Sequence, residues 1–469
     1  MDPEAFAHHL ASPCGRDHVP VCAHTGTAGG AACGDLVRID LRVDSAHVAD
    51  AGFSAAGCGA AHAAGSAAVA LVRGRPLLDA ARVGVHEIAE ELGGLSPGKL
   101  HAADLAADAL HRALGAAARA SAEVEGQEGR VLVAMSGGVD SAVAALRSGP
   151  RAVTVTLELW RDPEGDPEGS CCSASAVRRA RALAHGLGLP HLTLDLREEF
   201  RAHVVEPWVA GYAAGETPNP CVACNGHVRL DAMLDLADRL GCGGGLVTGH
   251  YARLAETADS RGPLLRTARD AAKDQTYMLA ALAPASLARL RFPLGELTKP
   301  EVRALAAEAG LPVAAQPDSQ DLCFLAGVGR ERFLARFIAP RPGALTRDGA
   351  PIGVHDGQHA FTVGQRKGLG VAAPEPLYVL AKHGDEVRLG TRGELETTRV
   401  PIRDLTLRRE PERVRAARLR YHAQAIPAGL EGDALALHEP APGAAPGQLA
   451  CLLDGELVVG WATIDSAPG

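Results

Sequence analysis

The chain has 469 residues, 47% of them hydrophobic, and a formal net charge of −9 at pH 7. At about 150 residues per domain, this length predicts roughly three domains. Apolar runs stay well below the ~18 residues that a membrane helix needs, and we expect a cytoplasmic protein with no membrane partner. The acidic total argues against nucleic-acid binding over the whole surface, but it leaves room for a local basic face.

The 11 cysteines do not suggest a disulfide framework, because the expected compartment keeps thiols reduced. We interpret them as metal ligands, sulfur carriers or core residues. The cysteines whose sequence context suggests chemistry are Cys33, Cys58, Cys171, Cys172, Cys221, Cys224 and Cys323.

Residues 1–118 are predicted to form an α+β domain. Apolar and polar residues alternate over 36–43 and 48–54 as in half-buried strands, whereas 60–72, 77–81 and 101–118 are helical in period. Three turns could present ligands, and they contain Cys33-Gly-Asp35, Gly57-Cys58-Gly59 and Lys99-Leu-His101. Together these motifs resemble the iron-sulfur cluster assembly scaffolds of the IscU/NifU type, in which they converge on a cluster.

This domain departs from the resembled family at one position. The family has a third cysteine directly after the histidine, and this chain has Ala102 there. The remaining candidate ligands form a set of mixed softness that suits zinc or an iron-sulfur cluster, and they are Cys33, Asp35, Cys58 and His101. The alternative is a docking module that no longer holds metal.

A small and polar stretch over 119–129 predicts a linker. Strand and helix patterns alternate after it, which predicts a parallel sheet covered by helices in an α/β domain over 130–325. The apolar run 131–134 leads into Ser136-Gly-Gly-Val-Asp-Ser141, and we expect a strand, a phosphate-binding loop and a helix. The loop resembles the SGGxDS loop of ATP pyrophosphatases, enzymes that cleave ATP to AMP and pyrophosphate and usually adenylate a carbonyl oxygen.

The segment Asn219-Pro-Cys221-Val-Ala-Cys224 predicts a helix start. Asn219 is a good N-cap and Pro220 suits the first turn, so the two cysteines should lie one turn apart at a helix N-terminus. That position favours the thiolate, which attacks electrophiles and binds metal. Half of a zinc site is the alternative, although a second Cys-x-x-Cys does not follow.

The C-terminal third changes in composition. Residues 326–392 are predicted to form a small β-rich connector, and 393–469 to form an antiparallel β-barrel, because short alternating runs are separated by turn residues. Basic residues are dense between Arg392 and Arg420. They suggest a phosphate-binding face, with an ordinary solvated surface as the alternative.

Residues 130–469 resemble the tRNA 2-thiouridine synthases (MnmA) nearly end to end. The matching motifs occur in the family's order, and they are the loop 136–141, Cys171-Cys172-Ser173, the segment 217–225, Thr248-Gly-His-Tyr251, Lys273-Asp-Gln-Thr-Tyr-Met278, the segment 318–324 and Gly364-Gln-Arg-Lys-Gly-Leu369. The resemblance implies that ATP, with Mg²⁺, adenylates the C2 carbonyl of the wobble uridine in tRNA and that sulfur then displaces AMP. This is the activity of a tRNA-uridine 2-sulfurtransferase.

The resemblance also implies roles for single residues. The implied ATP contacts are Ala134, Met135, Ser136, Gly137, Gly138, Val139, Asp140, Ser141, Leu157 and Gly249. The implied tRNA contacts are Asn219, Pro220, Lys273, Asp274, Gln275, Arg420 and Tyr421. Cys224 and Cys323 match the two functional cysteines of the family. Implied partners are the wobble-uridine tRNAs, such as those for Lys, Glu and Gln, and a cysteine desulfurase or another sulfur donor.

One common form of the family has Asp at the position of Cys221. Cys221, Cys224 and Cys323 could together hold a 4Fe-4S cluster with one open iron, which is the mechanism we favour because of the attached scaffold-like domain. In the competing mechanism Cys323 carries a persulfide and Cys224 resolves the product as a disulfide. Two other functions are weighed: an amide-forming ligase of the same loop class, and an iron-sulfur carrier that only docks RNA.

Overall fold

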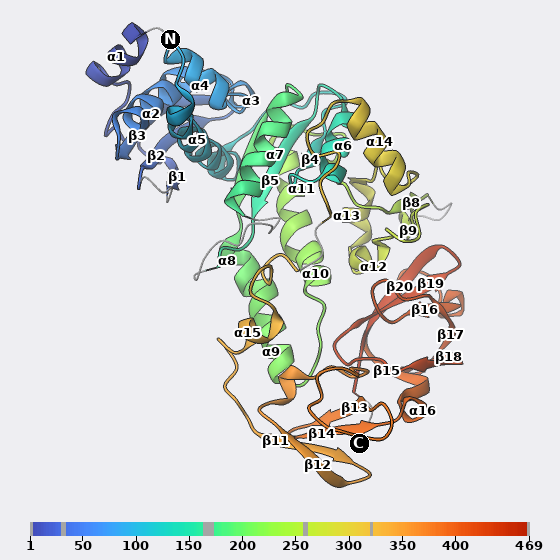
Figure 1. The fold of residues 1–469 in the computed structure, drawn as a ribbon. Coiled ribbons are helices and arrows are strands. Elements are labelled where there is room, and N and C mark those ends of the chain that lie inside the picture. The colour runs from blue at the N-terminus through green and yellow to red at the C-terminus, as the bar shows by residue number, and fades with distance from the viewer. Residues whose placement is uncertain (1–2, 30–33, 163–172, 257–260, 319–321, 467–469) are drawn as a thin grey trace.

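The computed structural model describes residues 3–29, 34–162, 173–256, 261–318 and 322–466. Figure 1 shows an N-terminal α+β domain in blue, a central α/β domain in green to yellow, a connector in orange and a C-terminal barrel in red. The fold class predicted for each part is confirmed. Among the described residues, no helix is long and apolar enough to cross a bilayer.

The N-terminal domain is built on a three-stranded antiparallel sheet in the order β1-β2-β3. Its elements are α1 (Pro3–Ala11), β1 (His24–Gly29), β2 (Leu36–Asp44), β3 (His47–Ala56), α2 (Gly59–Val72), α3 (Leu77–Ala80), α4 (Val85–Glu91), η1 (Pro97–Lys99) and α5 (Leu100–Ser121). Val37, Ile39 and Leu41 of β2 are buried, so the alternation in the sequence marks the face that packs on the helices.

The central domain has a five-stranded parallel sheet in the order β10-β7-β4-β5-β6. Its strands are β4 (Leu132–Ala134), β5 (Val153–Glu158), β6 (His191–Asp195), β7 (Leu246–Val247) and β10 (Leu290–Arg291). The carboxyl ends of parallel strands meet at one edge of the sheet. The loop after β4 therefore shares an edge with the residues that follow β5, β6 and β7.

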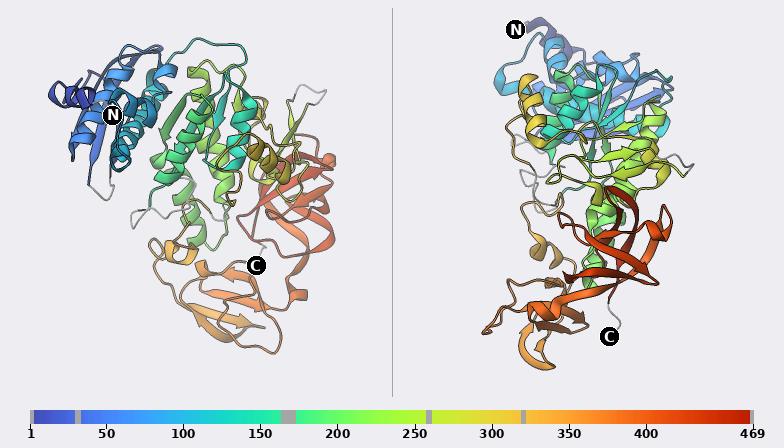
Figure 2. Two further views of the ribbon diagram at one scale, coloured as in Figure 1. Left: turned by 45° about the horizontal axis from the view of Figure 1, so that its top comes forward. Right: turned by 90° about the vertical axis from the view of Figure 1, so that its right-hand side faces the viewer.

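Helices surround this sheet and continue below it (Figure 2). They are α6 (Val139–Ser148), α7 (Ala174–Gly186), α8 (Arg197–Phe200), η2 (Arg201–Val205), α9 (Glu206–Ala213), α10 (Pro220–Ala223), η3 (Cys224–Arg229), α11 (Leu230–Arg239), α12 (Thr276–Leu279), α13 (Pro284–Ala288) and α14 (Lys299–Glu308). The segments η2 and η3 are π-helical, a local widening of the helix that is frequent at functional sites.

The connector is a four-stranded sheet in the order β12-β11-β14-β13. Its elements are α15 (Arg330–Leu334), β11 (Gly343–Arg347), β12 (Ala350–His355), η4 (Gln358–Ala360), β13 (Tyr378–His383), β14 (Glu386–Gly390) and α16 (Arg392–Leu395). Leu345, Val379 and Val387 of this sheet belong to a separate small core.

The C-terminal part is a closed antiparallel barrel of six strands in the order β15-β18-β17-β16-β19-β20, closed by pairing of β15 with β20. The strands are β15 (Glu396–Leu407), β16 (Ala416–Arg418), β17 (Ile426–Glu431), β18 (Ala434–Pro442), β19 (Leu449–Asp454) and β20 (Leu457–Ile464), with η5 (Pro411–Arg413) between β15 and β16. The hairpin of β8 (Arg253–Ala255) and β9 (Leu264–Arg266), which comes from the central domain, extends this sheet beyond β20.

Helix α5 lies between the N-terminal domain and the edge strand β6 of the central sheet. His111 of α5 has one ring nitrogen 2.8 Å from the His191 carbonyl oxygen of β6, and the His191 amide donates to the Ala81 carbonyl at 2.9 Å. Arg181 of α7 is buried and pairs with Asp104 and Asp108 of α5. The two domains are therefore joined by a packed and polar interface.

The segment predicted as a linker is partly ordered, by the extension of α5 and by a contact with α11. Helix α5 runs to Ser121, three residues beyond the predicted helix end, because its Ala-rich sequence continues to favour a helix and Ala117 and Ala118 are buried. After it, the Val124 amide donates to the Arg239 carbonyl at 2.8 Å. These contacts fasten the chain to α11 before β4 begins.

Candidate functional site

The phosphate-loop sequence forms the expected strand, loop and helix. Ser141 of α6 accepts a hydrogen bond from the Ser136 amide at 3.1 Å and donates to the Gly138 carbonyl at 3.0 Å, which closes the loop. Gly137 has a φ of +76°, a conformation that favours glycine, and its carbonyl accepts from Arg179 at 3.0 Å. The loop therefore has a fixed shape, and helix α6 directs its positive end into it.

The structure brings the other implied ATP contacts to the same edge. A Cβ on Gly249, which follows β7, would lie 2.9 Å from the Asp140 carbonyl carbon, so these two segments touch. Leu157 lies near the end of β5, two residues beyond the partner of Ala134. A loop that leaves space only for glycine at such positions suits the close approach of a nucleotide.

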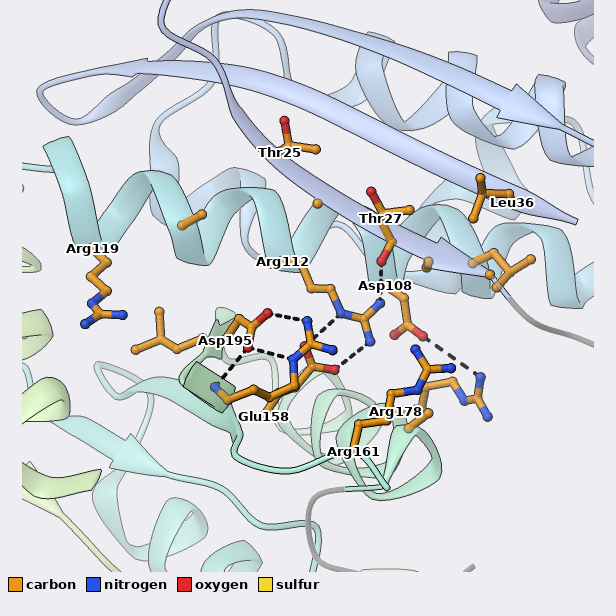
Figure 3. A pocket seen from close by; sticks show the side chains of 18 of the residues that line it. Thr25, Thr27, Leu36, Asp108, Arg112, Arg119, Glu158, Arg161, Arg178 and Asp195 are labelled. Atoms are coloured by element: carbon orange, nitrogen blue, oxygen red, sulfur yellow. Dashed lines mark hydrogen bonds and ion pairs between the residues drawn. The ribbon is translucent and has the colours of Figure 1, made fainter. Parts of the chain in front are cut away.

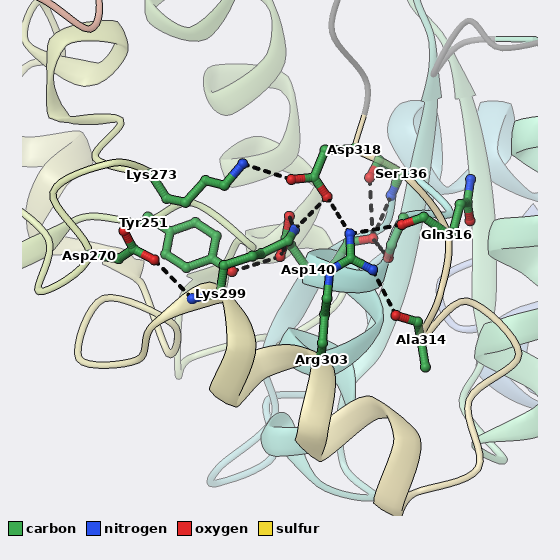
Figure 4. Close-up of polar contacts among 12 residues, drawn as sticks. Ser136, Asp140, Tyr251, Asp270, Lys273, Lys299, Arg303, Ala314, Gln316 and Asp318 are labelled. Carbon is green, nitrogen blue, oxygen red and sulfur yellow. Dashed lines mark hydrogen bonds and ion pairs between the residues drawn. The ribbon is translucent and has the colours of Figure 1, made fainter.

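A network of charged side chains lies beside this loop (Figure 4). The Asp140 carboxylate accepts from Lys299 at 2.7 Å and from the Tyr251 hydroxyl at 2.8 Å. Asp318 accepts from Lys273 at 2.8 Å and pairs with Lys299 and Arg303, both at 2.9 Å. Burial alone would raise the pKa of Asp318, but hydrogen bonds from Lys273 and Lys299 outweigh it and lower that pKa to about 2.

The Cys-x-x-Cys segment forms the predicted helix start. The Asn219 side chain accepts from the Cys221 amide at 3.0 Å, and Pro220 is the first residue of α10. Cys221 is half-buried, Cys224 is buried, and the helix continues through η3 into α11. The side chain of Asn225 donates to the Met278 carbonyl at 3.4 Å, so the motif 273–278 packs directly on the motif 217–225.

Three implied tRNA contacts meet next to Cys221. Tyr421 of the barrel hydrogen-bonds Gln275, and its pKa is raised by burial and by the neighbouring Asp274 and Cys221. Gln275 also accepts from the Tyr251 amide at 3.0 Å. Asp274 is buried and pairs with Arg418 of β16 at 2.6 Å. Its position suits the orientation of neighbouring side chains better than direct contact with a ligand in solvent.

Cys323 lies in a turn beside a cluster of aromatic rings. Phe324, the next residue, is buried with its ring 5.2 Å from Trp208 and 5.2 Å from Phe333, measured between centroids. Cys323 itself is half-buried and packs against the main core, of which Cys224 is a buried member. The aromatic anchor fixes the position of the backbone at Cys323. Cys171 and Cys172 lie outside the described residues.

The expectation of one basic face over 392–420 is wrong for two of its residues. Arg408 and Arg409 are buried, and Arg408 donates to the Ala280 carbonyl at 2.8 Å and to the Leu282 carbonyl. They join the barrel to the central domain, where their long side chains satisfy backbone carbonyls. Arg420 donates to the Gly443 carbonyl at 3.3 Å and remains half-buried beside Tyr421.

The N-terminal domain brings three of its four predicted ligands together. Ligand atoms of Asp35, Cys58 and His101 lie within 4.8 Å of one another. The Cys58 thiol is 3.1 Å from an Asp35 carboxylate oxygen, and His101 Nε2 is 3.3 Å from that same oxygen. Cys33, the fourth predicted ligand, lies outside the described residues.

The orientation of His101 suits a metal ligand. Its Nδ1 lies 2.9 Å from the Gly98 carbonyl oxygen, an acceptor that suits a proton on Nδ1, and Nε2 is the ring nitrogen that faces Cys58 and Asp35. Metal-binding histidines usually donate their other N–H to a carbonyl in this way. Ala102 is fully buried, so the position of the family's third cysteine is part of the core packing here.

A cavity of about 950 Å³ lies between the N-terminal and central domains (Figure 3). Strand β1 and helix α5 form one side, and the ends of β5 and β6, the residues that follow them and the start of α7 form the other. Arg112 crosses it, pairing with Glu158 at 2.6 Å and donating to the Thr27 carbonyl at 3.0 Å. The cavity is lined by both polar and apolar side chains, and the contacts of Arg112 across it tie the two domains together.

Sequence reasoning missed Lys299 and Arg303. They lie more than 150 residues after the loop that they accompany. A signal was present in Thr298-Lys-Pro-Glu301, a capping box with proline in the first turn, which predicts a helix start with lysine at its first position. A cation is disfavoured at a helix N-terminus unless an anion compensates it.

The fold and the site first define a class: a multidomain α/β enzyme with a phosphate-binding loop, joined to a scaffold-like α+β domain. Family models match residues 129–327 (tRNA methyl transferase HUP domain), 331–389 (tRNA methyl transferase PRC-barrel domain) and 13–122 (NifU-like N terminal domain). A Rubrobacter xylanophilus protein named bifunctional protein NifU/MnmA is 44% identical to this chain, and the match spans 97% of each of the two chains. The chain belongs to this NifU/MnmA family.

Other relatives match parts of the chain. A tRNA-specific 2-thiouridylase MnmA from Sorangium cellulosum is 42% identical over 72% of this chain and 92% of its own length. A solved structure titled as a putative iron-sulfur cluster assembly scaffold protein from Fervidobacterium islandicum matches 24% of this chain and 94% of its own length at 16% identity, with a TM-score of 0.20.

Proposed function

We propose that this chain is a tRNA-uridine 2-sulfurtransferase that uses ATP to activate the C2 carbonyl oxygen of the wobble uridine and then replaces that oxygen by sulfur. One observation carries the proposal: three motifs distant in sequence, around Cys221, Gln275 and Tyr421, meet at one place. The names of the relatives support the same reaction. The substrates we propose are the tRNAs with a wobble uridine, such as those for Lys, Glu and Gln.

The phosphate loop prepares the leaving group. Backbone amides between Ser136 and Ser141 and the N-terminal end of α6 would hold the phosphates of ATP, and Gly249 leaves room beside them. The Asp140 carboxylate fits a hard cation by its chemistry, and bound Mg²⁺ would supply charge neutralisation on the phosphates. Met135 and Leu157 are buried apolar neighbours that keep water from the loop.

The cysteines carry the sulfur step. Asn219 caps α10 and fixes Cys221 at a helix N-terminus, where a thiolate is favoured. Cys221, Cys224 and Cys323 are a suitable ligand set for a 4Fe-4S cluster, which would supply an open iron for a sulfide. The competing route uses a persulfide on Cys323, with Cys224 as the resolving thiol. A cysteine desulfurase or another donor would supply the sulfur.

We propose that the N-terminal domain binds a metal ion or cluster through Asp35, Cys58, His101 and Cys33. Its fixed interface with β6 holds this site at a constant position beside the central domain. The mixed donor set fits zinc better than an all-thiolate cluster. We assign residues 1–118 to this domain, 119–129 to the connection, 130–325 to the ATP domain, 326–392 to the connector and 393–469 to the barrel.

The decisive experiment supplies the full chain with ATP, Mg²⁺, a sulfur source and tRNA from a thiolation-deficient strain. We expect 2-thiouridine in the nucleoside digest, and no product when ATP is omitted. If no 2-thiouridine forms under anaerobic conditions after a cluster has been reconstituted, the proposal is refuted. Formation of an amide product in place of 2-thiouridine would assign the chain to the ligases of the same loop class.

A further inference from the structure

Lys299 occupies an unusual place for a lysine. It is the first residue of α14, and its amide donates to Asp270 at 2.9 Å. The helix dipole opposes a positive charge at this end of a helix. The side chain is only 9% exposed, so little solvation offsets that cost. The charge therefore depends on the anions that surround it.

Those anions belong to the phosphate loop and to the segment before Cys323. Lys299 Nζ lies 2.7 Å from both carboxylate oxygens of Asp140 and 2.9 Å from Asp318, with the Tyr251 ring centroid 5.9 Å away (Figure 4). Asp318 is also paired with Lys273 and Arg303. Within the described residues Asp140 forms an ion pair only with Lys299, so Lys299 is the cation that balances the loop carboxylate.

We infer that Lys299 is a catalytic residue that binds the phosphates of ATP and stabilises the pyrophosphate leaving group. This inference rests on the proposed function, because it concerns the adenylation step of that reaction. ATP would bring further negative charge to the loop that Lys299 already faces. Asp318 remains beside Lys299 as a counter-ion and fixes the direction of its side chain.

The step has a defined balance. The O2 atom of uracil forms a bond to the α-phosphorus, the bond from that phosphorus to the bridging oxygen breaks, and its electron pair leaves with pyrophosphate. The N3 proton of uracil passes to solvent. Negative charge grows on the leaving oxygen, so a cation held in advance beside the phosphates stabilises the transition state more than bound ATP.

The test measures pyrophosphate release by the full chain with Mg-ATP and unthiolated tRNA, varying ATP to separate kcat from KM. For Lys299→Met we expect kcat to fall about 100-fold or more, with a smaller change in KM, as for loss of a group that acts mainly in the transition state. Lys299→Arg keeps the charge and should retain most of the activity. The matched control is Arg269→Gln, which removes a cation at the same end of α14, where Arg269 pairs with Glu301.

A Lys299→Met variant with a kcat within about threefold of the wild type would overturn the inference, as would an equal loss in Arg269→Gln. If Lys299→Met does not fold, Lys299→Met with Asp318→Asn removes both charges and should fold yet remain inactive. A wild-type chain that releases no tRNA-dependent pyrophosphate would refute the proposed function itself. Wild-type turnover with an active Lys299→Met variant would refute only the role of Lys299.

Discussion

Gly115 of helix α5 lies directly against the Thr193 carbonyl oxygen of β6, so that a Cβ on Gly115 would overlap that oxygen. The two residues belong to different domains, and the close approach places the N-terminal domain on the edge of the central sheet. An exposed edge strand offers unpaired backbone groups to other chains. Here the backbone of His191 is paired with His111 and Ala81 of the N-terminal domain.

Gly115→Ala should destabilise the protein, although alanine is the better helix former. The added methyl group has no space, so α5 must shift, and we expect a loss of about 1–3 kcal/mol in the free energy of unfolding. The control is Gly186→Ala at the end of α7, where nothing lies within 4 Å of the new Cβ. Denaturant unfolding measures the stability of both variants. Equal stability of the two would contradict the close approach of Gly115 to Thr193.

Asp318→Asn should remove a pH-dependent part of the stability. The pKa of Asp318 is lowered to about 2, below its value in an unfolded chain, so its contribution is present above about pH 4 and is lost as pH falls from 4 toward 2. We expect Asp318→Asn to cost about 2 kcal/mol at pH 6 and progressively less below pH 4. Denaturant unfolding over this range checks the sign.

The exposed Asp348 supplies the comparison for that experiment. Asp348→Asn removes the same charge from a surface turn, where Arg347 Nε lies 3.7 Å from the carboxylate. We expect almost no change in stability at any pH, because exposed pairs contribute little. If Asp318→Asn behaves in the same way, the network beside the phosphate loop does not hold its carboxylate in the ionised form.

Cys58→Ser combined with His101→Ala should lower the zinc content of the purified full chain by about one ion. The reason is that Nε2 of His101 and the thiol of Cys58 converge beside Asp35. Elemental analysis measures the change, and His8→Ala, an exposed histidine of α1, is the control. An unchanged metal content would favour the docking module without metal.

Cys221→Ser should abolish a brown chromophore and the thiolation activity together. Both effects follow if Cys221 is one of three thiolate ligands, because two ligands do not hold a 4Fe-4S cluster with one open iron. Visible absorption and nucleoside analysis after anaerobic reconstitution are the readouts, with the exposed Cys22→Ser as control. A colourless and active Cys221→Ser variant would refute the cluster and leave the persulfide route.

Local signals in the sequence were sufficient for the elements that carry the chemistry. Asn219 caps α10 as its residue type predicts, since capping depends only on the next three residues. The glycines and serines of 136–141 likewise form a closed loop through contacts within six residues. The order of strands and helices predicted the parallel sheet, because alternating elements have few ways to pack.

Long-range pairs could not be predicted in the same way. Lys299 and Asp140 are 159 residues apart, and the residues around either one do not indicate that it pairs with the other. Helix α5 is apolar on more than one face, and its sequence does not say that the second face covers β6. Composition places Arg408 and Arg409 in a basic surface, because it does not reveal that they are buried among backbone carbonyls.

The β8–β9 hairpin belongs to the central domain in sequence, yet β9 pairs with β20 and continues the barrel sheet. Arg266 of β9 also pairs with Glu456 at 2.6 Å, and Tyr277 donates to the Leu449 carbonyl at 2.7 Å. These bonds remove a hinge between the two parts. Under the proposed function, a tRNA anticodon loop bound between these two parts would meet surfaces at a fixed spacing, and the loop rather than the enzyme would change shape to bring its base to Cys221.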